Sequence, residues 1–108
     1  MSVGLIFTSE GCYCFDRNNT PDLTKLFKEQ RINTIPDYHQ DDLQQALQEH
    51  LGGRYQEMLT RFDHKPVWKN FIYDKVMVHP WINPISRNIL GDTFGDVGEI
   101  YGHVILTE

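Results

Sequence analysis

Residues 41–53 read DDLQQALQEHLGG, and this stretch decides the structure of the middle of the chain. Its apolar residues recur at helical spacing: Leu43, Ala46, Leu47 and Leu51. Since side chains three and four residues apart lie on one side of a helix, the pattern predicts an amphipathic helix that begins at or near Asp41. Gly52 and Gly53 follow directly, and glycine at this place is typical of a helix C-terminus with left-handed backbone.

Two further helices are predicted on either side of this one. Residues 55–62 repeat the apolar spacing: Tyr55, Met58, Leu59 and Phe62. The repeat predicts a short helix joined to the previous one by a tight corner. Upstream, Thr20 followed by Pro21 and Asp22 has the residue types of a helix N-terminus. We expect that helix to continue to about Arg31, where an extended segment follows.

Strand-forming residues occupy both ends of the chain. Residues 3–8 and 12–15 flank a turn-forming cluster, so the chain is expected to open as a hairpin. Aromatic and β-branched residues predict one or two strands within residues 67–78, and a final strand is expected at residues 99–107. Between them we expect a brief helix at residues 84–90 and a loop at residues 92–98.

The order of these elements predicts the fold class. Strands come first, helices next and strands last, without the βαβ alternation that accompanies parallel sheets. We therefore expect an α+β fold in which residues 1–108 form a single globular domain. Its sheet should be mainly antiparallel, built from the N-terminal hairpin and the C-terminal strands, with two or three helices on one face.

The expected final strand is apolar on both of its faces. One face carries Ile100, Gly102, Val104 and Leu106, and the other carries Tyr101, His103, Ile105 and Thr107. Such a strand is either central in the sheet and paired on both sides, or an edge strand that another chain covers. The sequence supports the two alternatives equally. The edge alternative predicts a homodimer or a β-augmented complex through this strand.

Charge is unevenly distributed along the chain. The formal net charge is −5, which argues against a general binder of nucleic acids or of anionic membranes. Residues 32–53 contain four acidic residues and no Lys or Arg: Asp37, Asp41, Asp42 and Glu49. We hypothesise that these four form a binding face for a basic protein partner. The alternative is that they serve as helix N-terminal and turn residues.

Residues 54–81 mix basic and aromatic side chains, as nucleic-acid-binding surfaces do. Tyr55 and Phe62 belong to an apolar helical stripe, however, and should face the core. Together with the acidic net charge, this predicts that nucleic acid is not the partner.

Catalytic motifs are missing from the sequence. It contains no phosphate-binding glycine loop, nucleophile elbow or H-E-x-x-H motif. An enzymatic alternative depends on histidine, because imidazole titrates near neutral pH. The candidates are His79, at an expected strand end, and His64 with its neighbour Asp63. Adjacency in sequence is weak support, since catalytic pairs are defined by their geometry.

Cys12 and Cys14 are the only two cysteines. On a strand they share one face, but two thiols supply half of the four ligands that a structural zinc site needs. We expect them to pack as small apolar groups, and we expect no metal and no other cofactor. No run approaches the ~20 apolar residues of a membrane helix. Without a disulfide framework, the sequence predicts a cytoplasmic protein that does not enter membranes.

These features lead to two hypotheses about function. The leading one is a small acidic cytoplasmic protein-binding module, acting as an inhibitor, an immunity-type neutraliser or an accessory subunit by occupying a partner's surface. The alternative is a small hydrolase or nucleic-acid-processing enzyme that uses His and Asp for acid-base chemistry. The missing motifs favour the first.

Overall fold

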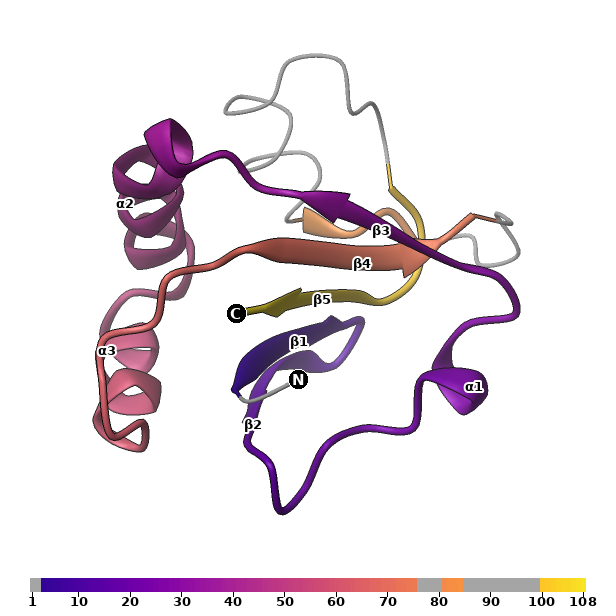
Figure 1. Ribbon diagram of the computed structural model, residues 1–108, viewed down its shortest axis with the longest axis horizontal. Coiled ribbons are helices and arrows are strands. Elements are labelled where there is room, and N and C mark those ends of the chain that lie inside the picture. Colours follow the sequence, from indigo (N-terminus) through magenta and orange to yellow (C-terminus); the bar gives the residue numbers. More distant parts are fainter. Residues whose placement is uncertain (1–2, 76–80, 85–99) are drawn as a thin grey trace.

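A computed structural model describes residues 3–75, 81–84 and 100–108. It confirms the predicted α+β fold: an antiparallel five-stranded sheet in the order β2-β1-β5-β4-β3, accompanied by helices (Figure 1). The strands are β1 Gly4–Thr8, β2 Gly11–Phe15, β3 Gln30–Thr34, β4 Asn70–Asp74 and β5 Val104–Thr107. The helices are α1 Leu23–Leu26, α2 Gln40–Leu51 and α3 Gly53–Thr60, with a 3-10 turn, η1, at Asp37–His39. The expected helix at 84–90 and loop at 92–98 lie outside the described residues, apart from Pro84.

The C-terminal strand β5 is central in the sheet. It pairs with β1 on one side and with β4 on the other, so that Ile105 lies between Ile6 and Ile72. Of the two alternatives for this strand, the central one is confirmed and the edge one is wrong. Along Val104–Thr107, β5 has no free edge through which a homodimer or a β-augmented complex could form. Both of its faces are apolar because both faces of the sheet are covered: Val104 and Leu106 belong to one buried cluster and Ile105 to another.

The predicted first helix is mostly replaced by other structure. Only Leu23–Leu26 is helical, and its N-cap is Asp22, whose carboxylate accepts a hydrogen bond from the backbone N–H of Thr24. The helix ends at Phe27, which is extended and buried against the sheet. Residues 30–34 then pair with β4 as strand β3. Pairing with an existing sheet thus outweighs the modest helix propensity of these residues.

Helices α2 and α3 follow the sequence prediction closely. Leu43 and Leu47 of α2 and Tyr55 and Met58 of α3 are buried on their inner sides. Gly52 joins the two helices with φ 59° and ψ −136°, a positive-φ conformation that favours glycine but differs in ψ from the left-handed cap that the sequence predicted. The two helices cover one face of the sheet, while α1 contributes to a smaller cluster on the other face with Phe27 (Figure 1).

Trp68, which precedes β4, joins the two helices to the sheet. Its side chain is fully buried, and its indole N–H donates to the hydroxyl of Tyr55 at 3.2 Å. The Tyr55 hydroxyl in turn donates to Gln44 of α2. Gln40 holds the backbone of Trp68 at both its N–H and its carbonyl oxygen. Among the described residues, every buried side-chain nitrogen and oxygen has a hydrogen-bond partner.

The Tyr55 hydroxyl should matter for stability more than an exposed hydroxyl does. We expect Tyr55→Phe to lower the free energy of unfolding by about 1–3 kcal/mol, because it leaves the buried indole N–H without an acceptor. Tyr38→Phe is the matched control, since Tyr38 is 79% exposed, and should change stability by less than about 0.5 kcal/mol. Urea denaturation measures both, and equal stabilities for the two variants would contradict the role given to the hydroxyl.

Gly4 lies where the sheet has no room for a side chain. A Cβ there would stand 2.5 Å from the Leu106 carbonyl oxygen and closer still to the Phe15 ring. We expect Gly4→Ala to destabilise the fold by about 1–3 kcal/mol through overpacking. Gly53→Ala, where a Cβ meets nothing within 4 Å, should leave stability unchanged or raise it by up to about 1 kcal/mol. Thermal unfolding of the two variants would decide, and a Gly4→Ala protein as stable as the wild type would refute this account of the packing.

Candidate functional site

The outer side of α2 carries three of the four acidic residues that the sequence singled out. Leu43 and Leu47 point into the core, so the opposite side of the helix holds Asp41, Asp42 and Glu49, which are all exposed. We call these three residues the acidic face. Gln45 lies in its middle and donates to the Glu49 carboxylate at 3.3 Å. Asp41 and Asp42 also stand in the first turn of the helix, where acidic side chains complement its dipole.

Asp37 has a different environment from the acidic face. It belongs to η1, and its carboxylate forms an ion pair with the Lys69 ammonium at 2.9 Å. Both side chains are exposed, so the pair contributes little to stability but offsets the charge of Asp37. The structure thus brings together Asp41, Asp42 and Glu49, whereas Asp37 lies beside them with its charge partly neutralised.

Tyr38 adds an aromatic ring next to the acidic face. The ring lies 4.3 Å from that of His39, centroid to centroid, and 79% of Tyr38 is exposed. An aromatic side chain so exposed gains no stability from core packing, while tyrosine is among the residues that dominate protein–protein contacts. Sequence reasoning did not select Tyr38, and its position just before the apolar pattern of α2 was the available signal.

The second candidate site contains His64, which lies between two carboxylates. Its Nδ1 is 2.5 Å from an Asp63 oxygen, and its Nε2 is 2.8 and 2.7 Å from the two Glu108 oxygens. The residues come from the turn after α3 and from the residue that follows β5. The expected pairing of Asp63 with His64 is therefore present, and Glu108 is a partner that sequence reasoning missed because it lies far away in the chain.

These carboxylates set the charge of His64. The hydrogen bond to Asp63, and then that to Glu108, raises the pKa of the imidazole above its ordinary value. The hydrogen bond with His64 also lowers the pKa of the Asp63 carboxyl. A protonated imidazole that donates from both nitrogens has no lone pair left to take a proton or to bind a metal ion. The cluster therefore links the turn after α3 to the residue after β5, and its two carboxylates favour the protonated form of His64.

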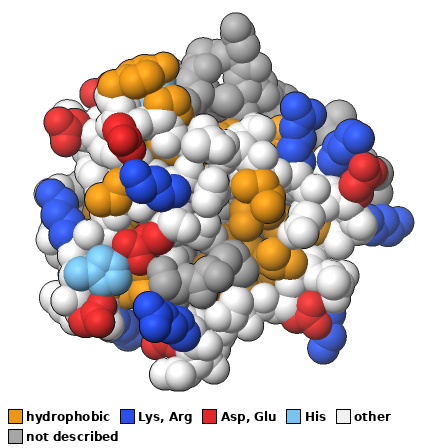
Figure 2. Space-filling view, in the orientation of Figure 1, with side chains coloured by type: hydrophobic (Ala, Val, Ile, Leu, Met, Phe, Trp, Pro, Cys, Tyr) orange, Lys and Arg blue, Asp and Glu red, His pale blue; other side chains and the backbone are white. Residues whose placement is uncertain are grey.

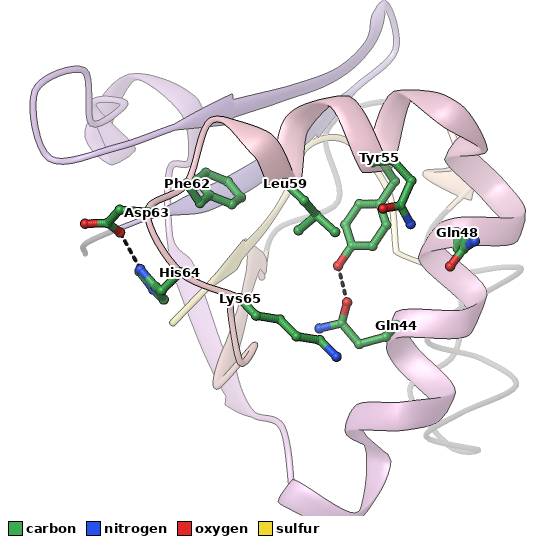
Figure 3. A pocket seen from close by; sticks show the side chains of 9 residues that line it. Gln44, Gln48, Tyr55, Leu59, Phe62, Asp63, His64 and Lys65 are labelled. Atoms are coloured by element: carbon green, nitrogen blue, oxygen red, sulfur yellow. Dashed lines mark hydrogen bonds and ion pairs between the residues drawn. The ribbon is translucent and has the colours of Figure 1, made fainter.

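A pocket opens beside this cluster. It has a volume of about 480 Å³, and Figure 3 shows His64 and Lys65 on one side of it and Gln44 on the other. The Tyr55 hydroxyl reaches toward it but is hydrogen-bonded to Gln44. Burial raises the pKa of Tyr55, so its hydroxyl stays protonated at neutral pH. The lining thus offers hydrogen bonds to a ligand rather than a free base or nucleophile.

The remaining candidates are His79 and the two cysteines. His79 lies outside the described residues. Cys12 is buried as expected, and burial raises the pKa of its thiol to about 12, which makes it a poor nucleophile and metal ligand. In residues 3–75, 81–84 and 100–108, no group of three or more His, Cys, Asp or Glu side chains is arranged to hold a metal ion. No helix in this part of the chain is long and apolar enough to cross a membrane.

Comparison with known proteins found no relative of the chain. No family model, no curated protein and no solved structure matches the chain. Its function must therefore be inferred from its own surface.

The His64 bridge should be visible in a pH titration. The proton of His64 is stabilised in the folded state, so the stability that it contributes is fully present below the unfolded pKa of about 6.5 and is lost as the pH rises through the higher folded value. Asp63 shifts the other way, and its contribution is lost as the pH falls through its lowered value. We expect the NMR resonances of the His64 ring to titrate above about pH 6.5.

Two substitutions locate the cause of this shift. Glu108→Gln should lower the titration midpoint of His64 toward its ordinary value, because it removes one of the two anionic acceptors. Glu10→Gln, an identical change in the turn between β1 and β2, should leave it unchanged. A His64 midpoint that does not respond to Glu108→Gln would mean that the two side chains are not bonded in solution.

Proposed function

We propose that the chain is a small protein-binding module that covers a basic surface of its partner with the acidic face of α2. The observation that carries the proposal is the exposure of Asp41, Asp42 and Glu49 together beside Tyr38, on a helix without Lys or Arg. Charges arranged in this way speed the encounter with a basic surface and select against acidic ones. Tyr38 would supply the apolar contact that charge alone does not provide.

The biological role follows from this mode of binding. An inhibitor, an immunity-type neutraliser or an accessory subunit can each act by occupying a surface, and none of them needs a catalytic group. We place the protein in the cytoplasm, where the thiols of Cys12 and Cys14 would remain reduced. The enzymatic alternative has less support, because both ring nitrogens of His64 are bonded to carboxylates.

The acidic face can be tested by charge reversal. We expect Asp41→Lys combined with Asp42→Lys to slow association with the partner and to weaken its dependence on salt. The double variant should remain folded, at a cost of about 0.3–1 kcal/mol per residue from the helix dipole. Glu10→Lys combined with Glu57→Lys is the control, since it raises the net charge by the same amount at exposed positions away from α2.

The measurement is a capture experiment from native lysate at physiological salt, followed by association kinetics with the captured protein. A protein retained by the wild type and by the control, but not by the acidic-face variant, would support the proposal. Capture that is equal for all three, or no capture by the wild type, would refute it.

A further inference from the structure

The two edges of the sheet are protected to very different degrees. Along β2, the carbonyl oxygen of Cys12 points outward and accepts a hydrogen bond from the Arg54 guanidinium at 2.7 Å. The same guanidinium lies 5.8 Å from the ring centroid of Tyr13, on the exposed side of the strand. A cation from α3 thus occupies the edge of β2, which is a common way to prevent another strand from pairing there.

The outer edge of β3 has no such cover in the described part of the chain. Two backbone hydrogen bonds fix which residues face inward: Ile35 N–H donates to Lys69, and Lys75 N–H donates to Glu29. Because pairing in an antiparallel ladder alternates, odd-numbered residues of β3 face β4 and even-numbered ones face outward. The backbone groups of Gln30, Ile32 and Thr34 therefore point away from the sheet, and no described residue bonds them.

Ile32 also ends a row of mostly apolar side chains that crosses the whole sheet. The register aligns one residue from each strand on the face that α1 partly covers: Tyr13, Ile6, Ile105, Ile72 and Ile32. Ile105 and Ile72 are buried, but Ile32 is 55% exposed. Figure 2 shows apolar surface over the middle of the sheet. Charged side chains are one of the devices that protect an edge strand, and β3 has one at Arg31, but the residue at its centre is isoleucine.

The charges on either side of β3 are of opposite sign. Lys25 and Lys28 precede β3 and Arg31 lies in it, and none of the three has an ion-pair partner among the described residues. Glu29, directly before the strand, is paired with Lys75 at 3.2 Å. The chain that leaves β3 carries Asp37 and then the acidic face of α2.

We propose that β3 pairs with β3 of a second copy, antiparallel and around a two-fold axis at Ile32. This register places Ile32 opposite its own counterpart and Gln30 opposite Thr34 of the other copy. Each of these facing pairs then exchanges two backbone hydrogen bonds, because all of its groups point outward. The basic end of each strand meets the acidic end of the other, so the two copies attract rather than repel. The result is a continuous sheet made from both copies.

A second copy of β3 complements the charges at the two ends of the strand, and this favours it over an unrelated strand as the partner. Antiparallel two-fold pairing necessarily brings the start of one β3 next to the end of the other, and these ends are complementary here. Arg31 faces Asn33 of the other copy, so no like charges stand directly opposite. The backbone contacts of the dimer lie along β3, whereas the proposed binding function uses the side chains of the acidic face. Sedimentation of variants at Ile32 therefore tests the dimer separately from partner capture.

The test uses the purified full chain and sedimentation equilibrium over a wide concentration range. We expect the wild type to dimerise, and we expect Ile32→Lys and Ile32→Glu each to raise the dissociation constant about tenfold or more, because like charges then face each other across the axis. An equimolar mixture of the two variants should dimerise again, since an ammonium from one copy would then face a carboxylate from the other. Tyr13→Glu, at the covered edge, is the control and should dimerise like the wild type.

Hydrogen exchange provides a measurement that needs no variant. The amides of Gln30, Ile32 and Thr34 should exchange more slowly as protein concentration rises, while those of Arg31 and Asn33, which face β4, should be protected at every concentration. A wild type that stays monomeric, a dimer insensitive to both Ile32 variants, or a mixture that fails to reassociate would each overturn the proposal. Concentration-independent exchange at the three outward amides would do so even if the variants did not fold.

Discussion

Burial of Trp68 is the constraint on which the rest of the structure depends. A tryptophan side chain gains much from leaving water, but only if its indole N–H finds an acceptor. That acceptor is Tyr55 of α3, and the backbone of Trp68 is held by Gln40 of α2. Both helices must therefore dock before this residue is satisfied, and β4 begins two residues later. One buried side chain thus fixes how the helix pair lies on the sheet.

Coverage of the sheet follows from this arrangement. The helix pair protects one face over the strands that surround β5, whereas the other face receives only α1 and the residues near Phe27 among the described parts of the chain. The central strand can then be apolar on both sides. The two edge strands differ in their cover. Arg54 of α3 reaches the edge of β2, but no described residue reaches the outer edge of β3.

The charged groups of α2 and of the His64 cluster lie in different environments. The acidic residues on α2 are exposed because the opposite side of the helix, with Leu43 and Leu47, packs in the core. His64 is instead hydrogen-bonded at both ring nitrogens, to Asp63 and to Glu108, and these bonds raise the pKa of its imidazole.

The sequence by itself determined the elements whose signal is local. The apolar spacing and the glycine pair of residues 41–53 set α2 and its corner with α3, and the hairpin turn at residues 9–10 set β1 and β2. The exposed acids of α2 could be read from the same spacing. Tertiary structure alone decided that β5 is central, that residues 30–34 form a strand rather than the end of a helix, and that Glu108 bonds His64. Each of these depends on contacts between residues distant in the chain, and hydrophobic periodicity carries no information about which strand or side chain will be the neighbour.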